Sequence, residues 1–316
     1  MQIYLPIAEM SVNLFLILTM GGAVGFLSGM FGVGGGFLMT PLLIFIGVPP
    51  AVAVGTQSNQ LVAASVSGVL AHWRKGNVDV KMGVVMLAGS TVGTLLGVLL
   101  FGWLQRLGQI DLVISLSYIL FLGVIAILML VESLRSMLKL RRTTGQRGKL
   151  HKHNALHGLP LKTRFPKSRL YISALLPLGI GFIGGVMVAI MGIGGGFFLV
   201  PAMIYVLGMP ATLVAGTSLF QVIFSSAIAA FLQAYQNQTV DLLLALMLLA
   251  GGVIGAQFGT RAANVLRGDQ ARALLAALVL AVCLKLSFDL VAPPDEPFSL
   301  QIVTAFLAGA DAGRIA

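Results

Sequence analysis

Two glycine clusters have the composition and spacing best suited to bind a ligand. They are Gly32-Val-Gly-Gly-Gly36 and Gly192-Ile-Gly-Gly-Gly196, and each precedes a short apolar stretch, 37–48 or 197–208. The first turn of a helix has unpaired N–H groups and a partial positive charge, and glycine lets a ligand approach the backbone closely. We therefore predict an anion cradle at two helix N-termini. Its residues are Gly34, Gly35, Gly36, Gly194, Gly195 and Gly196.

The alternative interpretation of these glycines is tight helix packing, which small residues allow in membranes. We prefer that alternative for Gly93-x-x-x-Gly97 and Gly255-x-x-x-Gly259, which lie inside long apolar runs. For the two clusters, the short stretches that follow them and their recurrence favour the anion cradle.

Neutral polar side chains form a second candidate layer. They follow Gly55 in the first half and Gly216 in the second, and they offer donors to an oxyanion. The alternative is helix capping and hydrogen bonding between helices, at about 0.6–2 kcal/mol each. The candidate substrate contacts are Thr56, Ser58, Gln60, Thr217, Ser218 and Gln221.

Other reactive side chains give weaker signals. Lys285 and Asp289 are four residues apart on one helix face, and we favour a structural ion pair over a proton relay. His151, His153 and His157 have a spacing that could hold a metal, but a solvated loop is favoured. We predict no cofactor. The single cysteine, Cys283, excludes an internal disulfide and a thiolate cluster.

An enzyme is not expected either. A membrane enzyme would carry carboxylates or histidines inside its helices, whereas the acidic residues here lie at the ends of apolar runs. They are Asp79, Asp111, Glu132 and Asp241. The chain also lacks the GxxxxGK[ST] phosphate-binding motif, which argues against ATP hydrolysis.

The elements that position these residues are membrane helices. Of 316 residues, 58% are hydrophobic and only 9% are charged, whereas a soluble domain has about 25% charged residues. Soluble enzymes and binding modules are therefore excluded. A bilayer crossing needs about 20 apolar residues. Runs of that length are 11–31, 52–72, 82–104, 111–131, 171–192, 212–234, 240–262 and 271–292.

The fold we expect is an all-α integral membrane protein with about eight full transmembrane helices and two short half-helices, broken or re-entrant. The half-helices are the stretches 37–48 and 197–208, whose length of about 18 Å is too short to cross. Segment 293–316 forms a C-terminal tail.

The net charge of +10 lies in one segment, 132–170, where eleven basic residues face only Glu132. The positive-inside rule makes this segment a cytoplasmic loop. A weaker alternative is that the basic segment contacts anionic membrane lipids. A nucleic-acid partner is disfavoured.

The two membrane parts, 11–131 and 171–292, repeat one another. Residues 31–41 match 191–201 at an offset of 160, and Val78-Asp79 matches Val240-Asp241 at an offset of 162. The basic residues lie on one side of the membrane only if each half contains an odd number of elements. We therefore predict two inverted repeats of five elements each, with both chain termini outside. Inverted repeats with broken helices are typical of transporters, whose substrate sites lie near the bilayer midplane.

With these residues, the chain resembles the TauE/SafE sulfite exporter family. The resemblance rests on the two glycine clusters followed by Pro41 or Pro201, on the Gly55-Thr56 and Gly216-Thr217 pairs, and on 72–79. It implies export of sulfite or a related organosulfur anion across the bacterial cytoplasmic (inner) membrane.

The hypothesis is a secondary transporter that works by alternating access, with a small anion as substrate and proton or ion coupling left open. The alternatives are a passive anion channel and a permease for a small solute without sulfur. A metal-ion importer is disfavoured, because the fourteen methionines show no repeating spacing.

Overall fold

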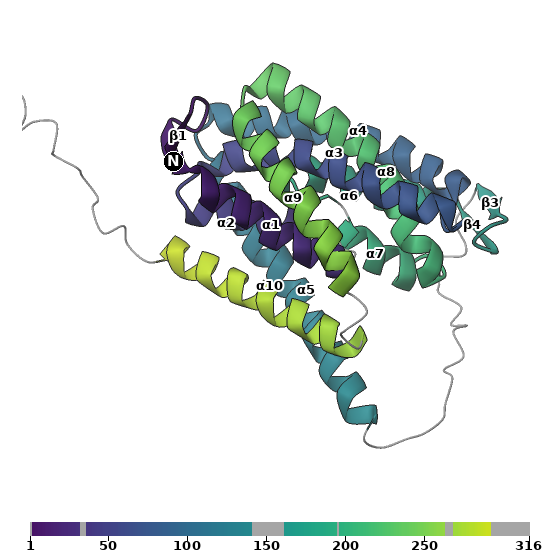
Figure 1. The fold of residues 1–316 in the computed structure, drawn as a ribbon. Helices are drawn as coiled ribbons and strands as arrows, with labels where there is room; N and C mark the ends of the chain where they lie inside the picture. The colour runs from purple at the N-terminus through teal and green to yellow at the C-terminus, as the bar shows by residue number, and fades with distance from the viewer. Residues whose placement is uncertain (1, 32–35, 141–160, 195, 263–267, 292–316) are drawn as a thin grey trace, which may run out of the picture.

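The computed structural model of the chain describes residues 2–31, 36–140, 161–194, 196–262 and 268–291. This part is almost entirely helical, as the sequence predicts (Figure 1). The first half contains α1 (Leu14–Phe31), α2 (Gly36–Phe45), α3 (Pro50–Arg74), α4 (Val80–Arg106) and α5 (Ile110–Leu140). The second half contains α6 (Leu175–Met191), α7 (Gly196–Tyr205), α8 (Ala211–Leu232), the π-helical segment η2 (Gln233–Asn237), α9 (Leu242–Ala262) and α10 (Gly268–Val291).

Several of these helices can cross a membrane. Within the described residues, five spans are long and apolar enough: Val80–Arg106, Ile110–Leu128, Thr212–Asn237, Leu242–Gly259 and Leu274–Val291. The outer face of α5 carries a stripe of leucines with the spacing of one helix face, at Leu112, Leu116 and Leu120, which are 54–68% exposed. Such a stripe is the surface that lipid covers. The chain is therefore a multi-pass α-helical membrane protein.

The remaining expected crossings are less simple. α1 and α6 are only 18 and 17 residues long. α3 has 25 residues, but its buried polar stretch at 56–60 lowers its hydropathy. The count of eight crossings therefore stays a prediction.

Short helices form at both predicted stretches, with slightly different ends, and their role as half-helices stays a prediction. α2 and α7 have ten residues each, about 15 Å of helix, and begin at Gly36 and Gly196. Pro41 and Pro201 lie inside these helices, five residues after their first residue. A proline in the second turn of a helix removes one intrahelical N–H donor.

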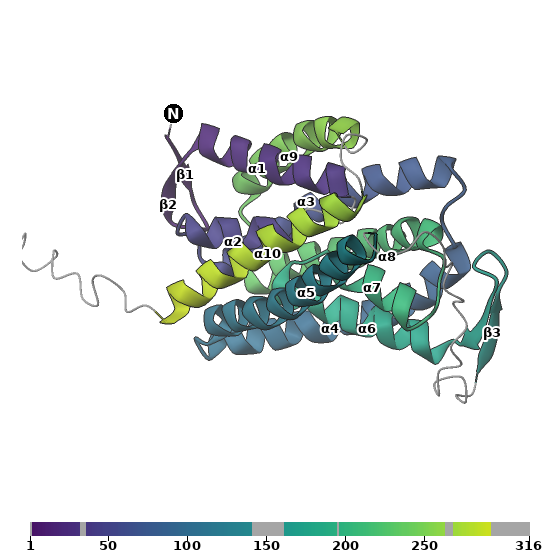
Figure 2. The same ribbon diagram turned by 90° about the horizontal axis from the view of Figure 1, so that it is seen from below.

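Two β-hairpins precede α1 and α6, and the sequence patterns did not predict them. β1 (Gln2–Leu5) pairs with β2 (Met10–Asn13), and β3 (Lys162–Phe165) pairs with β4 (Leu170–Ser173), both antiparallel. The second hairpin lies mostly within the segment 132–170, which we expected to be a loop, and α5 also extends into that segment as far as Leu140. The two hairpins lie at opposite ends of the helical body (Figures 1 and 2).

The halves pack against each other through matching helix pairs. α1 packs mainly on α9 and α4 on α6, while α3 packs on α8 and α5 on α10. If each helix is replaced by its equivalent in the other half, the α1–α9 pair becomes the α6–α4 pair. This pairing is what two related halves would give, and the inverted orientation of the repeats stays a prediction.

Glycines make these two helix pairs close. A Cβ atom at Gly93 of α4 would overlap the carbonyl oxygen of Phe182 in α6, and one at Gly255 of α9 would overlap that of Gly22 in α1. The packing interpretation of Gly93-x-x-x-Gly97 and Gly255-x-x-x-Gly259 is therefore confirmed.

Candidate functional site

The described residues of the two glycine clusters meet inside the molecule. A Cβ atom on Gly36, the first residue of α2, would lie 2.9 Å from the carbonyl oxygen of Gly192 and 3.2 Å from the nitrogen of Gly194. The start of α2 thus adjoins the chain that leads into α7. Of the predicted cradle residues, Gly34, Gly35 and Gly195 lie outside the described part of the chain.

Helix α3 forms a wall of this meeting point. Gly192 has a left-handed backbone (φ +62°), and a Cβ atom there would lie 2.9 Å from the carbonyl oxygen of Val54. A Cβ atom on Gly194 would lie 2.5 Å from a methyl carbon of Leu61. Val54 and Leu61 are seven residues apart and share one helix face, and Gln57 lies between them on that side.

Gln57 is a further candidate for the site, and the sequence alone does not single it out. Its side chain is fully buried (0% exposed), and neither its amide nitrogen nor its amide oxygen has a hydrogen-bond partner among the described residues. An unpaired buried polar group costs about 1–3 kcal/mol. Such a group next to the meeting glycines is what a site for a polar ligand requires. The signal in the sequence was the run of four polar residues from Gln57 to Gln60, but nothing there separates one member from another.

The two threonines of the predicted polar layer are already engaged. The hydroxyl oxygen of Thr56 accepts a hydrogen bond from the backbone N–H of Asp241 at 3.0 Å, and that of Thr217 accepts one from Asp79 at 2.9 Å. Thr217 also donates to the carbonyl of Leu213 at 2.7 Å. These bonds join the two halves of the chain, so the geometry favours the structural alternative for both threonines.

The other four predicted contacts differ among themselves. Ser58 and Ser218 donate within their own helices, to the carbonyls of Val54 and Ala215. The amide nitrogen of Gln60 donates to the carbonyl of Leu248 at 3.2 Å, and that of Gln221 reaches a neighbouring hydroxyl at 3.4 Å. The amide oxygens of Gln60 and Gln221 have no partner in the described structure. The amide oxygens of Gln60, three residues after Gln57, and of Gln221, the repeat equivalent of Gln60, can therefore still accept a hydrogen bond.

Tyr118 supports the second cluster from α5. Its buried hydroxyl donates to the carbonyl oxygen of Met191, the last residue of α6 before the glycines. A lone tyrosine in an apolar run gives no sequence signal for this role.

Each hairpin is attached to the opposite half of the chain by one buried carboxylate. Asp79 accepts at one oxygen from the backbone of Met82 and at the other from the backbone and hydroxyl of Ser168, in the turn between β3 and β4. Asp241 likewise accepts from the backbone of Leu243 and Leu244. Its other oxygen accepts from the N–H of Ile7 at 3.1 Å, in the turn between β1 and β2.

The remaining charged candidates give a simple result. Lys285 and Asp289 form an ion pair at 2.7 Å with both side chains about half exposed, in agreement with the structural interpretation. Lys285 also lies 4.5 Å from the centre of the Phe45 ring. Residues 151–157 lie outside the described structure, and the described residues hold no group of three potential metal ligands.

A multi-pass helical body in which two ten-residue apolar helices, α2 and α7, follow glycine clusters is typical of membrane transport proteins. The sequence matches the family model described as "Sulfite exporter TauE/SafE" over residues 17–286. The chain therefore belongs to the TauE/SafE family and is a membrane transporter.

Curated relatives give the same class. The chain is 30% identical to "Probable membrane transporter protein YjnA" of Bacillus subtilis (strain 168), over 88% of this chain and 100% of that protein. It is 29% identical to a "Probable membrane transporter protein" of Xylella fastidiosa (strain 9a5c), over 78% of this chain and 84% of the relative. No solved structure is significantly similar to the chain.

Proposed function

We propose that this protein is a secondary transporter that exports sulfite or a related organosulfur anion across the bacterial cytoplasmic membrane. The observation that carries the proposal is the contact of Gly36 with Gly192 and Gly194 against α3, the helix that also carries the unpaired amide of Gln57. The family description supports the sulfur anion and the outward direction.

The chemistry of the site fits a small oxyanion. The N-termini of α2 and α7 supply backbone N–H groups and the positive ends of two helix dipoles. The amide of Gln57 adds a neutral donor. Neutral donors hold the anion without a permanent buried countercharge, which would be costly within the membrane and would slow release.

Alternating access requires the two halves to move against each other around this site. The opposite halves are joined near the ends of the molecule by the Thr56–Asp241 and Thr217–Asp79 hydrogen bonds, and each hairpin is tied to the same aspartates. We propose that one set of these contacts loosens while the other stays closed, so that the anion is exposed to one side at a time.

Transport by purified protein in liposomes tests the proposal. Labelled sulfite, sulfate, thiosulfate, taurine and sulfoacetate would be supplied with and without a pH gradient. We expect saturable uptake of one sulfur anion, and a loss of at least about tenfold in Gln57→Leu and Gly194→Val. Gly179→Ala is the matched control, because a Cβ atom at that helical glycine meets nothing within 4 Å.

The same assay separates the alternatives. Counterflow of labelled substrate against unlabelled substrate indicates a carrier, whereas flux that does not saturate and shows no exchange indicates a passive anion channel. Uptake of a solute without sulfur, with none of the sulfur anions moving, would refute the sulfur substrate. Normal transport by folded Gln57→Leu and Gly194→Val would refute the site.

A further inference from the structure

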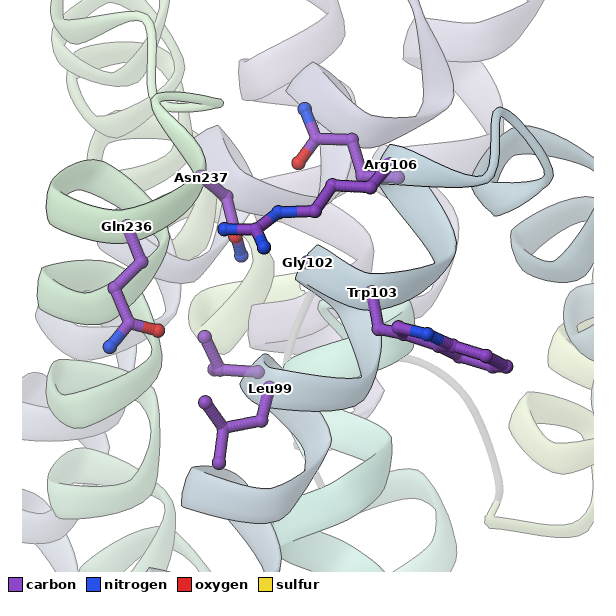
Figure 3. A pocket seen from close by; sticks show the side chains of 8 residues that line it. Leu99, Gly102, Trp103, Arg106, Gln236 and Asn237 are labelled. Carbon is purple, nitrogen blue, oxygen red and sulfur yellow. The ribbon is translucent and has the colours of Figure 1, made fainter.

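A pocket lies between the last turns of α4 and the π-helical segment η2. Its volume is about 710 Å³, and its lining includes Leu99, Gly102 and Arg106 from α4 and Gln236 and Asn237 from η2 (Figure 3). A Cβ atom on Gly102 would lie 2.6 Å from the side-chain oxygen of Asn237, so the glycine lets the two segments approach.

This pocket lies at a membrane–water boundary. Two of the five candidate membrane spans, Val80–Arg106 and Thr212–Asn237, end at its rim. Trp103, which also lines the pocket, is 59% exposed, and its ring is directed away from η2 (Figure 3). Exposed tryptophans at the end of a membrane helix are typical of the headgroup level.

The lining is apolar on the side deeper in the membrane and polar at the rim, as expected for a pocket at the headgroup level. Leu99, which is 59% exposed, lies nearly two turns deeper in α4 than Arg106 and provides an apolar wall. At the rim, the guanidinium of Arg106 reaches toward Asn237 of η2 (Figure 3). Among the described residues that line the pocket, Arg106 alone is charged, and it has no hydrogen bond or ion pair within the described structure.

We propose that this pocket binds one anionic phospholipid, with the phosphate at Arg106, the amides of Gln236 and Asn237 at the polar headgroup region, and an acyl chain along Leu99. A phospholipid fits better than a free inorganic anion, because the pocket is much larger than such an ion and has an apolar wall that an ion would not use. The single unpaired positive charge favours an anionic headgroup over a zwitterionic one.

The lipid would also stabilise the core beside the second glycine cluster. Asn237 donates to the buried side chain of Gln233 at 2.7 Å, and Gln233 donates to the carbonyl of Ala189 in α6 at 3.0 Å. Ala189 lies three residues before Gly192. Ordering of η2 by a lipid therefore reaches the end of α6 through two hydrogen bonds.

Native mass spectrometry of the detergent-purified protein tests the proposal. Phosphatidylglycerol would be titrated against the wild type, Arg106→Gln, Arg106→Lys and Arg74→Gln. Arg74 is the matched control, because it is exposed and, like Arg106, is the last residue of a helix whose final turn contains a tryptophan. We expect Arg106→Gln to weaken the first binding event by at least about tenfold, while Arg74→Gln leaves it unchanged and Arg106→Lys retains most of it.

Two further probes define the ligand. Phosphatidylcholine should bind several-fold more weakly than phosphatidylglycerol, and glycerophosphoglycerol, which lacks acyl chains, should not compete at millimolar concentration. Leu99→Gln should weaken phosphatidylglycerol binding although Arg106 is intact.

Three results would overturn the proposal. Equal losses in Arg106→Gln and Arg74→Gln would indicate diffuse attraction to basic residues. Competition by inorganic phosphate or by glycerophosphoglycerol would indicate a site for a free anion. Unchanged binding in Arg106→Gln would show that the lipid lies elsewhere.

Discussion

At the scale of single residues, buried polar groups in this protein fall into two kinds. Thr56, Thr217, Asp79 and Asp241 are fully buried and satisfied by contacts between the halves of the chain. Gln57 is equally buried and has no partner in the described structure. The first kind holds the fold together, and a group of the second kind is free to contact the proposed anion.

Gln57→Leu should therefore stabilise the protein while it removes transport. Replacing an unpaired buried amide with an apolar group of similar size removes its desolvation cost, so we expect the free energy of unfolding to rise by about 1–3 kcal/mol. Thermal unfolding in detergent measures this change. Gln233→Leu is the matched control, because the buried Gln233 amide donates to Ala189 and accepts from Asn237 and Thr239. The control should lower the midpoint temperature of unfolding. A lower midpoint temperature in Gln57→Leu would contradict the conclusion that the Gln57 amide is unpaired.

Thr217→Val should destabilise the protein. The change keeps the side-chain shape but leaves the buried backbone N–H of Asp79 without an acceptor, at a cost of about 1–3 kcal/mol. Thr91→Val serves as the comparison, since the Thr91 hydroxyl only donates to the carbonyl of Leu87 within its own helix. Equal midpoints for the two variants would show that the Thr217–Asp79 bond contributes nothing to the contact between the halves.

At the scale of helices, the π-helical segment explains a feature of the repeat. Gln60 and Gln221 match at an offset of 161, whereas the left-handed residues Gly76 and Gln238 match at 162. The extra residue of the second half therefore lies between 221 and 238, a stretch that contains η2 at 233–237. A π-helical turn is the usual way in which a helix absorbs one inserted residue, and here the insertion brings Gln236 and Asn237 to the pocket beside Arg106.

Close packing of the helix pairs leads to a prediction about Gly93. In Gly93→Ala the added methyl group would collide with the backbone carbonyl of Phe182, which cannot move without shifting α6 away from α4. We expect a loss of about 1–3 kcal/mol in the free energy of unfolding, measured by thermal unfolding in detergent. In Gly179→Ala the methyl group enters open space, so helix propensity should give up to about 1 kcal/mol of stabilisation. An unchanged midpoint in Gly93→Ala would show that glycine does not set the distance between α4 and α6.

At the scale of the whole molecule, the two hairpins mark opposite ends of the helical body (Figure 1). The positive-inside rule predicts that the end with β3 and β4 faces the cytoplasm, because the basic segment precedes it, and that the end with β1 and β2 faces outside. Each hairpin is held by an aspartate of the other half, so the ends of the molecule are built from both halves.

Cysteine labelling in intact cells tests this orientation. Cys283 is the single cysteine of the chain and is buried, so a Cys283→Ser background leaves no native thiol. An impermeant maleimide should label Gln109→Cys, in the turn between α4 and α5, without permeabilisation. It should label Lys167→Cys, in the second hairpin, only after permeabilisation. The reverse pattern would invert the topology, and labelling of both sites in intact cells would exclude it.

The sequence by itself determined the properties that depend on local composition. Mean hydropathy and run length predicted a helical membrane protein, and the glycine clusters followed by short apolar stretches predicted α2 and α7 to within one residue at their starts. The hairpins were not predicted because strands of four residues are too short to show an alternating pattern.

Only the tertiary structure decided which polar residues are available to a ligand. By residue type and position, Thr56 and Thr217 were as suitable as Gln57, yet their hydroxyl groups bind backbone atoms 185 and 138 residues away in the chain. The pocket at Arg106 likewise joins residues about 130 positions apart. Such pairings arise when helices from opposite halves pack together, and the spacing of residues along one helix carries no record of them.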